Sequence, residues 1–125
     1  KGLISTESGV LERTQYSFGT RFEEGKGTNP EELIGAAHAG CFSMALSMML
    51  GEEGFTADDI HAKADVSLDQ VEGGFSITAV HLTVTAKVPG ADEATFERAA
   101  NNAKQGCPVS KLFNADITMD AKLRG

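Results

Sequence analysis

The chain has 125 residues, of which 41% are hydrophobic, and a formal net charge of −7 at pH 7. This length is near the common size of a single domain with its own core. An acidic chain lacks the basic surface that sequence-independent nucleic-acid binding requires, and anionic membrane surfaces do not attract it. The longest apolar run, residues 33–50, is interrupted by polar residues, and the chain does not open with a signal peptide. We therefore expect one domain over residues 1–125, in a reducing cytoplasmic compartment, without nucleic-acid or membrane partners.

The first stretch, residues 3–22, is rich in β-forming residues and carries a turn signal at residues 7–9, so it predicts strands. Strand alternation places Tyr16 and Phe18 on one face and Arg21 on the other. The glycine-containing residues 23–27 predict a loop.

A strong helix start follows this loop. Asn29 suits the cap, Pro30 suits the first helical position, and Glu32 completes a pattern similar to a capping box. The helix should run to about Leu50, where Gly51 is expected to end it. It is apolar nearly all round, which indicates burial on most sides. Because one small sheet cannot cover such a helix, we infer that a partner chain does.

The second half of the chain predicts three strands and a shorter helix. Residues 60–71 and 75–88 alternate as strands, with a Glu-Gly-Gly hairpin signal between them. Residues 92–105 read as the shorter helix, residues 108–113 as one more turn, and residues 116–123 as the last strand. Strand neighbours joined by hairpins favour an antiparallel α+β fold.

The first of the two cysteines, Cys41, lies in the middle of the long helix. Apolar surroundings raise the pKa of a thiol, so the default interpretation is an inert buried residue. Cys41 becomes reactive only beside a cation, which His38, one turn earlier, or Arg21, from the preceding strand, could supply. A buried arginine needs a carboxylate in turn, and Glu31 or Glu32 could provide one.

The second cysteine, Cys107, precedes Pro108 at the start of a short helical turn, a position that favours the thiolate. The residues alone therefore point to Cys107 as the attacking thiol, against the alternative of a loop cysteine without a role. The sequence has no C-x-x-C or H-x-x-x-H spacing and no glycine-rich phosphate-binding motif, so we expect no metal and no cofactor.

Four segments together resemble a known family. They are Ser-Thr-Glu-Ser-Gly-Val-Leu at 5–11, Thr-Arg-Phe-Glu at 20–23, the long stretch 26–46 that includes His-Ala-Gly-Cys-Phe-Ser, and Gly-Cys-Pro-Val-Ser at 106–110. This pattern is similar to OsmC, the osmotically inducible protein C family, within the OsmC/Ohr superfamily of thiol peroxidases. The first and third segments favour the OsmC branch over the organic hydroperoxide resistance branch.

The resemblance implies a thiol-dependent peroxidase that reduces organic hydroperoxides in stress defence, without metal or haem. By motif match, Cys41 is the peroxidatic thiol, Cys107 resolves it through an intrachain disulfide, Arg21 activates Cys41, and Glu31 orients Arg21. This overrules the choice of Cys107 as the attacking thiol. The resemblance also implies an intertwined homodimer, with antiparallel sheets around two central helices, and an external dithiol reductant such as a lipoylated protein.

Two departures and one distance qualify the resemblance. Members of the family usually have one more N-terminal strand than this sequence predicts. Gly40 stands where alanine is expected. Glu31 and Cys41 are ten residues apart, which is about 15 Å along a helix. Either Glu31 lies in a non-helical entry, or the pair of Arg21 and Glu31 serves Cys41 of the partner chain. We favour the second, so the site should exist only in the dimer.

The apolar residues near Cys41, namely Phe42, Met44 and Met48, predict a preference for organic hydroperoxides over hydrogen peroxide. Two rival hypotheses come from other classes of protein. A non-catalytic protein that binds an apolar ligand would retain that ligand and consume no peroxide. A structural dimer with two inert thiols would show slow alkylation of Cys41, insensitive to pH.

Overall fold

The computed structural model describes residues 2–17, 19 and 27–125, and it contains two compact units, Lys1–Ile34 and Gly35–Gly125. The predicted placements of Phe18 and Arg21 lie outside the described residues. One helix, α2 (Pro30–Glu52), begins in the first unit and continues through the second. The expectation of one domain over the whole chain stays a prediction.

The first unit contains a small antiparallel sheet. Strand β1 (Gly2–Ile4) pairs with β2 (Thr14–Tyr16), with Gly2 opposite Tyr16. The predicted turn between them is confirmed, because the amide of Gly9 donates to the carbonyl of Thr6 at 3.0 Å and Gly9 has a φ of 84°. The strands are shorter than expected, since hydrogen bonds within residues 5–13 hold that connection as a loop.

The start of α2 is confirmed and its end is corrected. The side chain of Asn29 accepts a hydrogen bond from the Glu32 amide at 2.8 Å, and Pro30 is the first helical residue. The Glu32 carboxylate accepts from the hydroxyl of Thr28, so the capping pattern involves Thr28 as well. The predicted end at Gly51 is wrong, because α2 continues to Glu52. The chain leaves the helix at Gly54, whose φ of 89° is the left-handed conformation common after helix ends.

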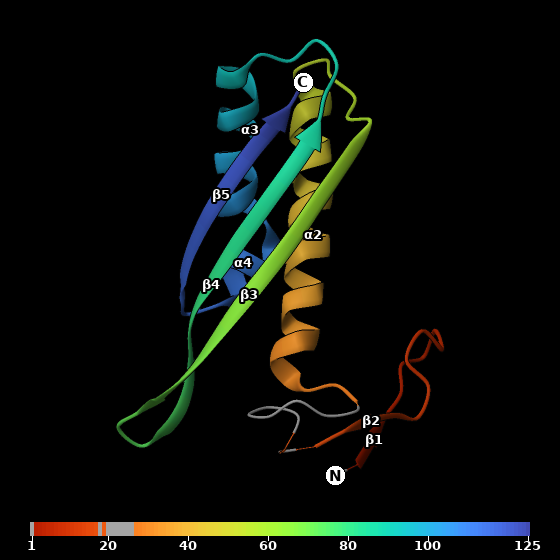
Figure 1. The fold of residues 1–125 in the computed structure, drawn as a ribbon, viewed down its shortest axis with the longest axis vertical. Helices are drawn as coiled ribbons and strands as arrows, with labels where there is room; N and C mark the ends of the chain where they lie inside the picture. The colour runs from red at the N-terminus through yellow and green to blue at the C-terminus, as the bar shows by residue number, and fades with distance from the viewer. Residues whose placement is uncertain (1, 18, 20–26) are drawn as a thin grey trace. The chain divides into compact units, whose positions relative to one another are not determined.

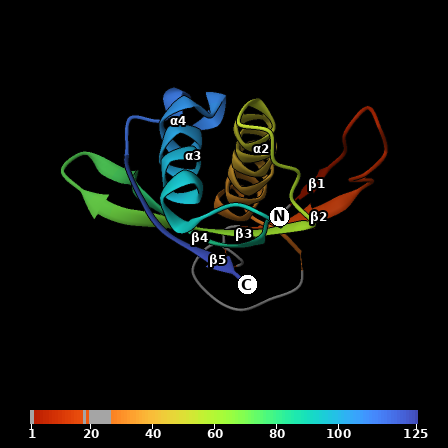
Figure 2. The same ribbon diagram turned by 90° about the horizontal axis from the view of Figure 1, so that it is seen from above.

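The second unit is a three-stranded sheet with its helices on one face (Figures 1 and 2). Its strands are β3 (Asp59–Val71), β4 (Gly74–Lys87) and β5 (Asp116–Arg124), in the order β3-β4-β5. Helices α3 (Glu93–Gly106) and α4 (Pro108–Leu112) connect β4 to β5. The α+β class and the predicted hairpin are confirmed, with Val71 paired to Gly74 across the turn. Figure 2 shows α2 and α3 side by side over the sheet.

The prediction of a purely antiparallel sheet is wrong for one strand pair. β3 and β4 are antiparallel, but β5 runs parallel to β4, with Ala79 opposite Asp116 and Lys87 opposite Arg124. The chain leaves β4, passes through α3 and α4, and returns at the other end of the sheet. A connection through helices allows parallel pairing, whereas a tight hairpin enforces antiparallel pairing.

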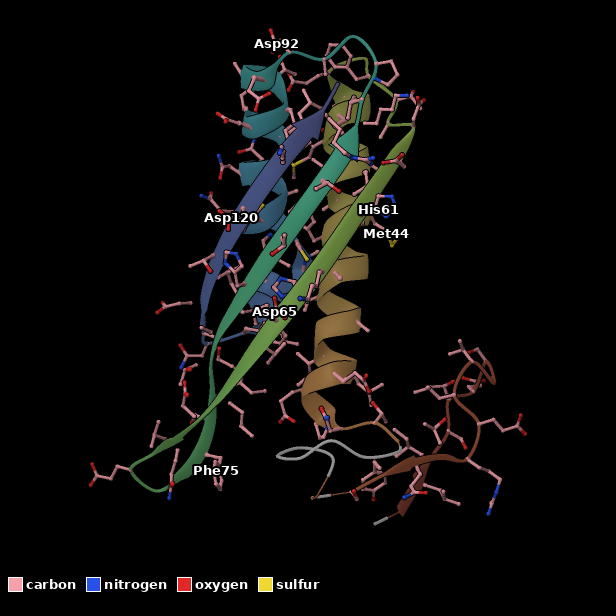
Figure 3. The ribbon with its side chains drawn as sticks, in the orientation of Figure 1. Met44, His61, Asp65, Phe75, Asp92 and Asp120 are labelled. Atoms are coloured by element: carbon pink, nitrogen blue, oxygen red, sulfur yellow. The ribbon has the colours of Figure 1, made fainter. Side chains whose placement is uncertain are left out.

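The core of the second unit lies between the helices and the sheet. The predicted alternation of the strands is confirmed, and α3 buries one apolar face against them. The fully or nearly fully buried apolar residues are Phe42, Leu46, Leu50, Val80, Leu82, Val84, Ala86, Val88, Phe96, Ala99, Ala100, Ala103 and Cys107. The opposite face of the sheet is polar and includes His61, Asp65 and Asp120, which Figure 3 labels along the strands. His61 and His81 lie on the strand surface, and His81 contacts Asp120 at 3.0 Å.

The two faces of α2 differ. The inward face is buried, and Gly35 lies so close to β3 that a Cβ there would be 3.1 Å from the carbonyl oxygen of Ala64. The outward face exposes Met44 to 76% and Met48 to 59%, and a Cβ on Gly40 would meet no atom within 4 Å. Figure 3 shows Met44 pointing away from the helices and the sheet. Among the described residues of one protomer, the burial on most sides that the sequence indicates for α2 is therefore incomplete.

By length and composition alone, α2 is apolar enough to cross a membrane, with a mean hydropathy of 1.6 over an 18-residue window. Core helices of globular proteins also meet this criterion, and the inward face of α2 packs in the core. The helix is thus weak evidence for a membrane span.

Candidate functional site

The fold brings together the two cysteines that the sequence keeps far apart. Cys41 is half-buried on α2, and Cys107 is fully buried between α3 and α4, where its amide donates to the Ala103 carbonyl at 2.9 Å. Both thiols are free, and they lie within hydrogen-bonding reach of each other. A pair of adjacent free thiols is the arrangement that a reversible dithiol reaction needs.

The surroundings of Cys41 in the described part of the chain favour its neutral form. Burial raises the pKa of the Cys41 thiol, and the hydrogen bond and the electrostatic interaction with Cys107 act in the same direction. The backbone amide of Val109 donates to the Cys41 sulfur and acts in the opposite direction, but it does not outweigh the others. Among the described residues, no cation appears among the groups that influence the Cys41 thiol. Arg21, the proposed activator, lies outside them.

His38 is unsuited to be that cation. Its ring is fully buried, and burial lowers the pKa of the imidazole, which keeps it neutral. Its Nε2 lies 2.7 Å from the hydroxyl oxygen of Ser110 on α4, and its ring meets the ring of Phe113 edge to face at 5.3 Å. The hypothesis that His38 supplies a positive charge to Cys41 is therefore not supported.

Glu31 lies in the first turn of α2, so the alternative of a non-helical entry is excluded. It is half-buried and already has an interaction partner. Glu32, the other predicted carboxylate, is exposed and accepts a hydrogen bond from the hydroxyl of Thr28. Because Arg21 lies outside the described residues, the assignment of Glu31 to orient Arg21 stays a prediction.

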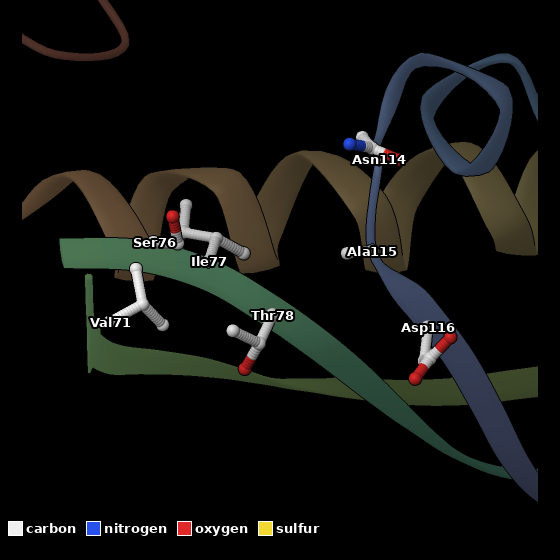
Figure 4. A pocket seen from close by; sticks show the side chains of 7 residues that line it. All are labelled: Val71, Ser76, Ile77, Thr78, Asn114, Ala115 and Asp116. Carbon is white, nitrogen blue, oxygen red and sulfur yellow. The ribbon is translucent and has the colours of Figure 1, made fainter. Parts of the chain in front are cut away.

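The prediction that Phe42, Met44 and Met48 together favour an organic substrate near Cys41 is corrected in one respect. Phe42 is fully buried against the sheet, so it cannot line an open pocket in the protomer. A surface pocket of about 430 Å³ lies elsewhere, between the far end of the β3–β4 hairpin and the segment that enters β5 (Figure 4). Its lining includes Ile77 and Asp116 and neither cysteine. Within the described ranges, no group of three or more His, Cys, Asp and Glu side chains could hold a metal ion.

Sequence reasoning missed two groups near the cysteines. These are the amide of Val109, which donates to Cys41, and the hydroxyl of Ser110, which contacts His38. Both belong to the Gly-Cys-Pro-Val-Ser segment at 106–110, so the resemblance of this segment to the family was the feature that could have identified them. The Cys107 amide is already bonded within α3 and Pro108 has no N–H, so Val109 offers the first unused amide of the new turn.

Comparison with known proteins agrees with this architecture. Residues 23–122 match the family model described as OsmC-like protein. The chain is 60% identical to peroxiredoxin OsmC of Escherichia coli over 99% of its own length and 87% of that protein. It is 31% identical to the organic hydroperoxide resistance protein OhrB of Bacillus subtilis, over 98% of its length and 89% of that protein. The chain therefore belongs to the OsmC-like family.

Solved structures show the same fold. The crystal structure of OhrB from Bacillus subtilis matches with a TM-score of 0.72 at 27% identity, covering 98% of this chain and 90% of that one. A putative organic hydroperoxide resistance protein from Vibrio cholerae, with captopril bound in one of its active sites, matches with a TM-score of 0.75 at 25% identity. That match covers 99% of this chain and 84% of the Vibrio protein.

Proposed function

We propose that this protein is a cytoplasmic thiol peroxidase that reduces organic hydroperoxides to alcohols and so protects the cell under oxidative or osmotic stress. The observation that carries the proposal is the contact between the Cys41 and Cys107 thiols in a chain 60% identical to a peroxiredoxin. The names of the organic hydroperoxide resistance relatives support the same class of substrate.

In the first step, the Cys41 thiolate attacks the distal oxygen of the hydroperoxide. The O–O bond breaks, Cys41 becomes a sulfenic acid, and the alkoxide takes a proton and leaves as the alcohol. The described surroundings raise the pKa of Cys41, so a positive charge must stabilise the thiolate at neutral pH. We assign this role to Arg21, which is permanently charged and can also stabilise charge on the departing oxygen.

In the second step, Cys107 resolves the sulfenic acid. Its sulfur attacks the sulfur of Cys41, an intrachain disulfide forms, and the hydroxyl group leaves as water with the proton of the Cys107 thiol. The interaction between the two thiols supports this assignment, because it makes Cys107 a neighbour of Cys41. An external dithiol, such as the lipoyl group of a lipoylated protein, then reduces the disulfide.

The working form in this proposal is a homodimer. The outward face of α2 exposes Met44 and Met48 in one protomer, and a second copy of the chain would cover them. Because Glu31 is helical and ten residues from Cys41, we assign the pair of Arg21 and Glu31 to the Cys41 of the partner. A second chain would also complete the apolar surroundings that favour organic hydroperoxides over hydrogen peroxide.

The test is a count of free thiols before and after one equivalent of cumene hydroperoxide, with mass spectrometry of the digest. We expect a Cys41–Cys107 linkage within seconds, and Cys41→Ser should abolish peroxide consumption. The matched control Cys107→Ser should still consume one equivalent and leave Cys41 oxidised. Faster turnover of hydrogen peroxide than of cumene hydroperoxide would contradict the proposed substrate class.

Two unchanged thiols would favour one of the rival hypotheses. An apolar ligand retained through purification would indicate a non-catalytic binding protein. Slow alkylation of Cys41 that does not change with pH would indicate a structural dimer with inert thiols.

A further inference from the structure

His38 and Ser110 form a buried polar contact beside the cysteine pair. His38 lies one turn before Cys41 on α2, and Ser110 lies three residues after Cys107, on α4. The 2.7 Å between His38 Nε2 and the Ser110 hydroxyl oxygen is a hydrogen-bonding distance. The two helices that carry the cysteines are thus also joined by this second pair of side chains.

This contact is the one hydrogen bond of the His38 ring in the described part of the chain. The other ring nitrogen, Nδ1, is buried and has no hydrogen-bond partner among the described residues. Phe113 contacts the ring edge to face, which adds packing but no hydrogen bond. Loss of a partner leaves a buried polar atom unsatisfied, so the hydrogen bond to Ser110 matters more than one at the surface.

Among the described residues, the segment 107–109 at the start of α4 supplies two groups that interact with the Cys41 thiol. They are the Cys107 thiol immediately before α4 and the Val109 amide within it. α4 has five residues, and a single turn has little stability of its own. Tertiary contacts must therefore hold it, and Ser110 makes such a contact next to Val109.

We propose that His38 is a positioning residue for the resolving step. Through Nε2 and the Ser110 hydroxyl, it holds α4 against α2 and keeps Cys107 beside Cys41. This inference rests on the proposed peroxidase function. Once Cys41 is a sulfenic acid, attack by Cys107 competes with a second hydroperoxide, which would oxidise Cys41 to the sulfinic acid and release a second alcohol. The intramolecular attack requires Cys107 to be held beside Cys41, whereas oxidation by free peroxide does not require Cys107.

The test compares variants that keep or remove the hydrogen bond. Ser110→Ala removes the hydroxyl, and Ser110→Thr keeps it. His38→Gln places an amide nitrogen close to the position of Nε2, whereas His38→Asn places its amide closer to Nδ1. We expect Ser110→Ala and His38→Asn to form the Cys41–Cys107 disulfide about tenfold more slowly, the effect of one hydrogen bond. Both should accumulate sulfinic acid at lower peroxide concentrations, while Ser110→Thr and His38→Gln stay near the parent.

The first step is measured separately, by trapping the Cys41 sulfenic acid with dimedone in a Cys107→Ser background. We expect Ser110→Ala to slow that step much less than disulfide formation, a separation of the two steps that a general loss of structure would not produce. Equal slowing of both steps, or an unchanged rate of disulfide formation in Ser110→Ala, would overturn the positioning role. A parent protein that consumes no cumene hydroperoxide would instead overturn the proposed function, so the two failures are distinguishable.

Discussion

The inward and outward faces of α2 have similar apolar composition but very different environments. The inward face, with Phe42 and Leu46, is completely buried against the sheet and α3. The outward face, with Gly40, Met44 and Met48, is exposed in the part of the protomer that the structure describes. Cys41 lies half-buried between the two faces.

The difference shows that one helix serves two purposes. Its inward face stabilises the protomer by removing apolar area from water. Its outward face gains nothing from the fold of one chain, and large exposed apolar patches mark interaction surfaces. In our proposal, the peroxidatic cysteine lies where the protomer core meets the partner, so folding and assembly both shape its surroundings.

The largest expected effect is on the inward face. Phe42→Ala removes a fully buried ring and leaves a cavity, so we expect a loss of about 3–5 kcal/mol in the free energy of unfolding. Denaturant unfolding at matched protein concentrations measures it, with Met44→Ala on the outward face as the control. An equal loss in the two variants would show that the faces are not energetically distinct.

The next effect is on the outward face. Met44→Asp places a charge where we propose an apolar contact between two copies of α2, so we expect the dimer to weaken roughly 100-fold. Light scattering coupled to size-exclusion chromatography measures the mass, and Met44→Leu is the matched control. Since Arg21 is assigned to the partner's site, the monomer should also lose peroxidase activity. A fully active monomer would show that the site is complete within one chain.

The smallest effect concerns the charge on Cys41. Its described surroundings raise the pKa, so Arg21→Gln should leave that rise unopposed and reduce the thiolate fraction at neutral pH. We expect the rate of Cys41 alkylation at pH 7 to fall roughly tenfold or more, and to approach that of the parent as the pH rises. Peptide-resolved alkylation with iodoacetamide measures both, with Arg21→Lys as the control that keeps a charge. A pH profile unchanged by Arg21→Gln would remove Arg21 from the mechanism.

Much of the fold could be predicted because its signals are local. Asn29 and Pro30 specify the start of α2, and the Glu-Gly-Gly sequence after Val71 specifies the hairpin. Alternation and helical periodicity identify the buried faces, since each depends only on neighbouring residues. The end of α2 was misplaced because two glycines compete there, and the backbone conformation of Gly54 decides between them.

The candidate site was less accessible to sequence reasoning. The position of Cys107 at the start of a helical turn selected it as the attacking thiol, and only the family resemblance directed attention to Cys41. Nothing local to His38 shows that its ring is neutral and bonded to Ser110, because that partner lies 72 positions further along the chain. The parallel pairing of β5 was missed for the same reason, since it depends on where α3 and α4 return the chain.

The sequence by itself determined the helices and strands, their buried faces and the protein family, because periodicity, capping residues and motif spacing are properties of neighbouring residues in the chain. The tertiary structure decided which distant groups meet. It placed Cys107 and the Val109 amide against Cys41, paired His38 with Ser110, and left Met44 and Met48 uncovered. These contacts depend on how whole helices pack on a sheet, and that packing is set by the combined burial of many residues.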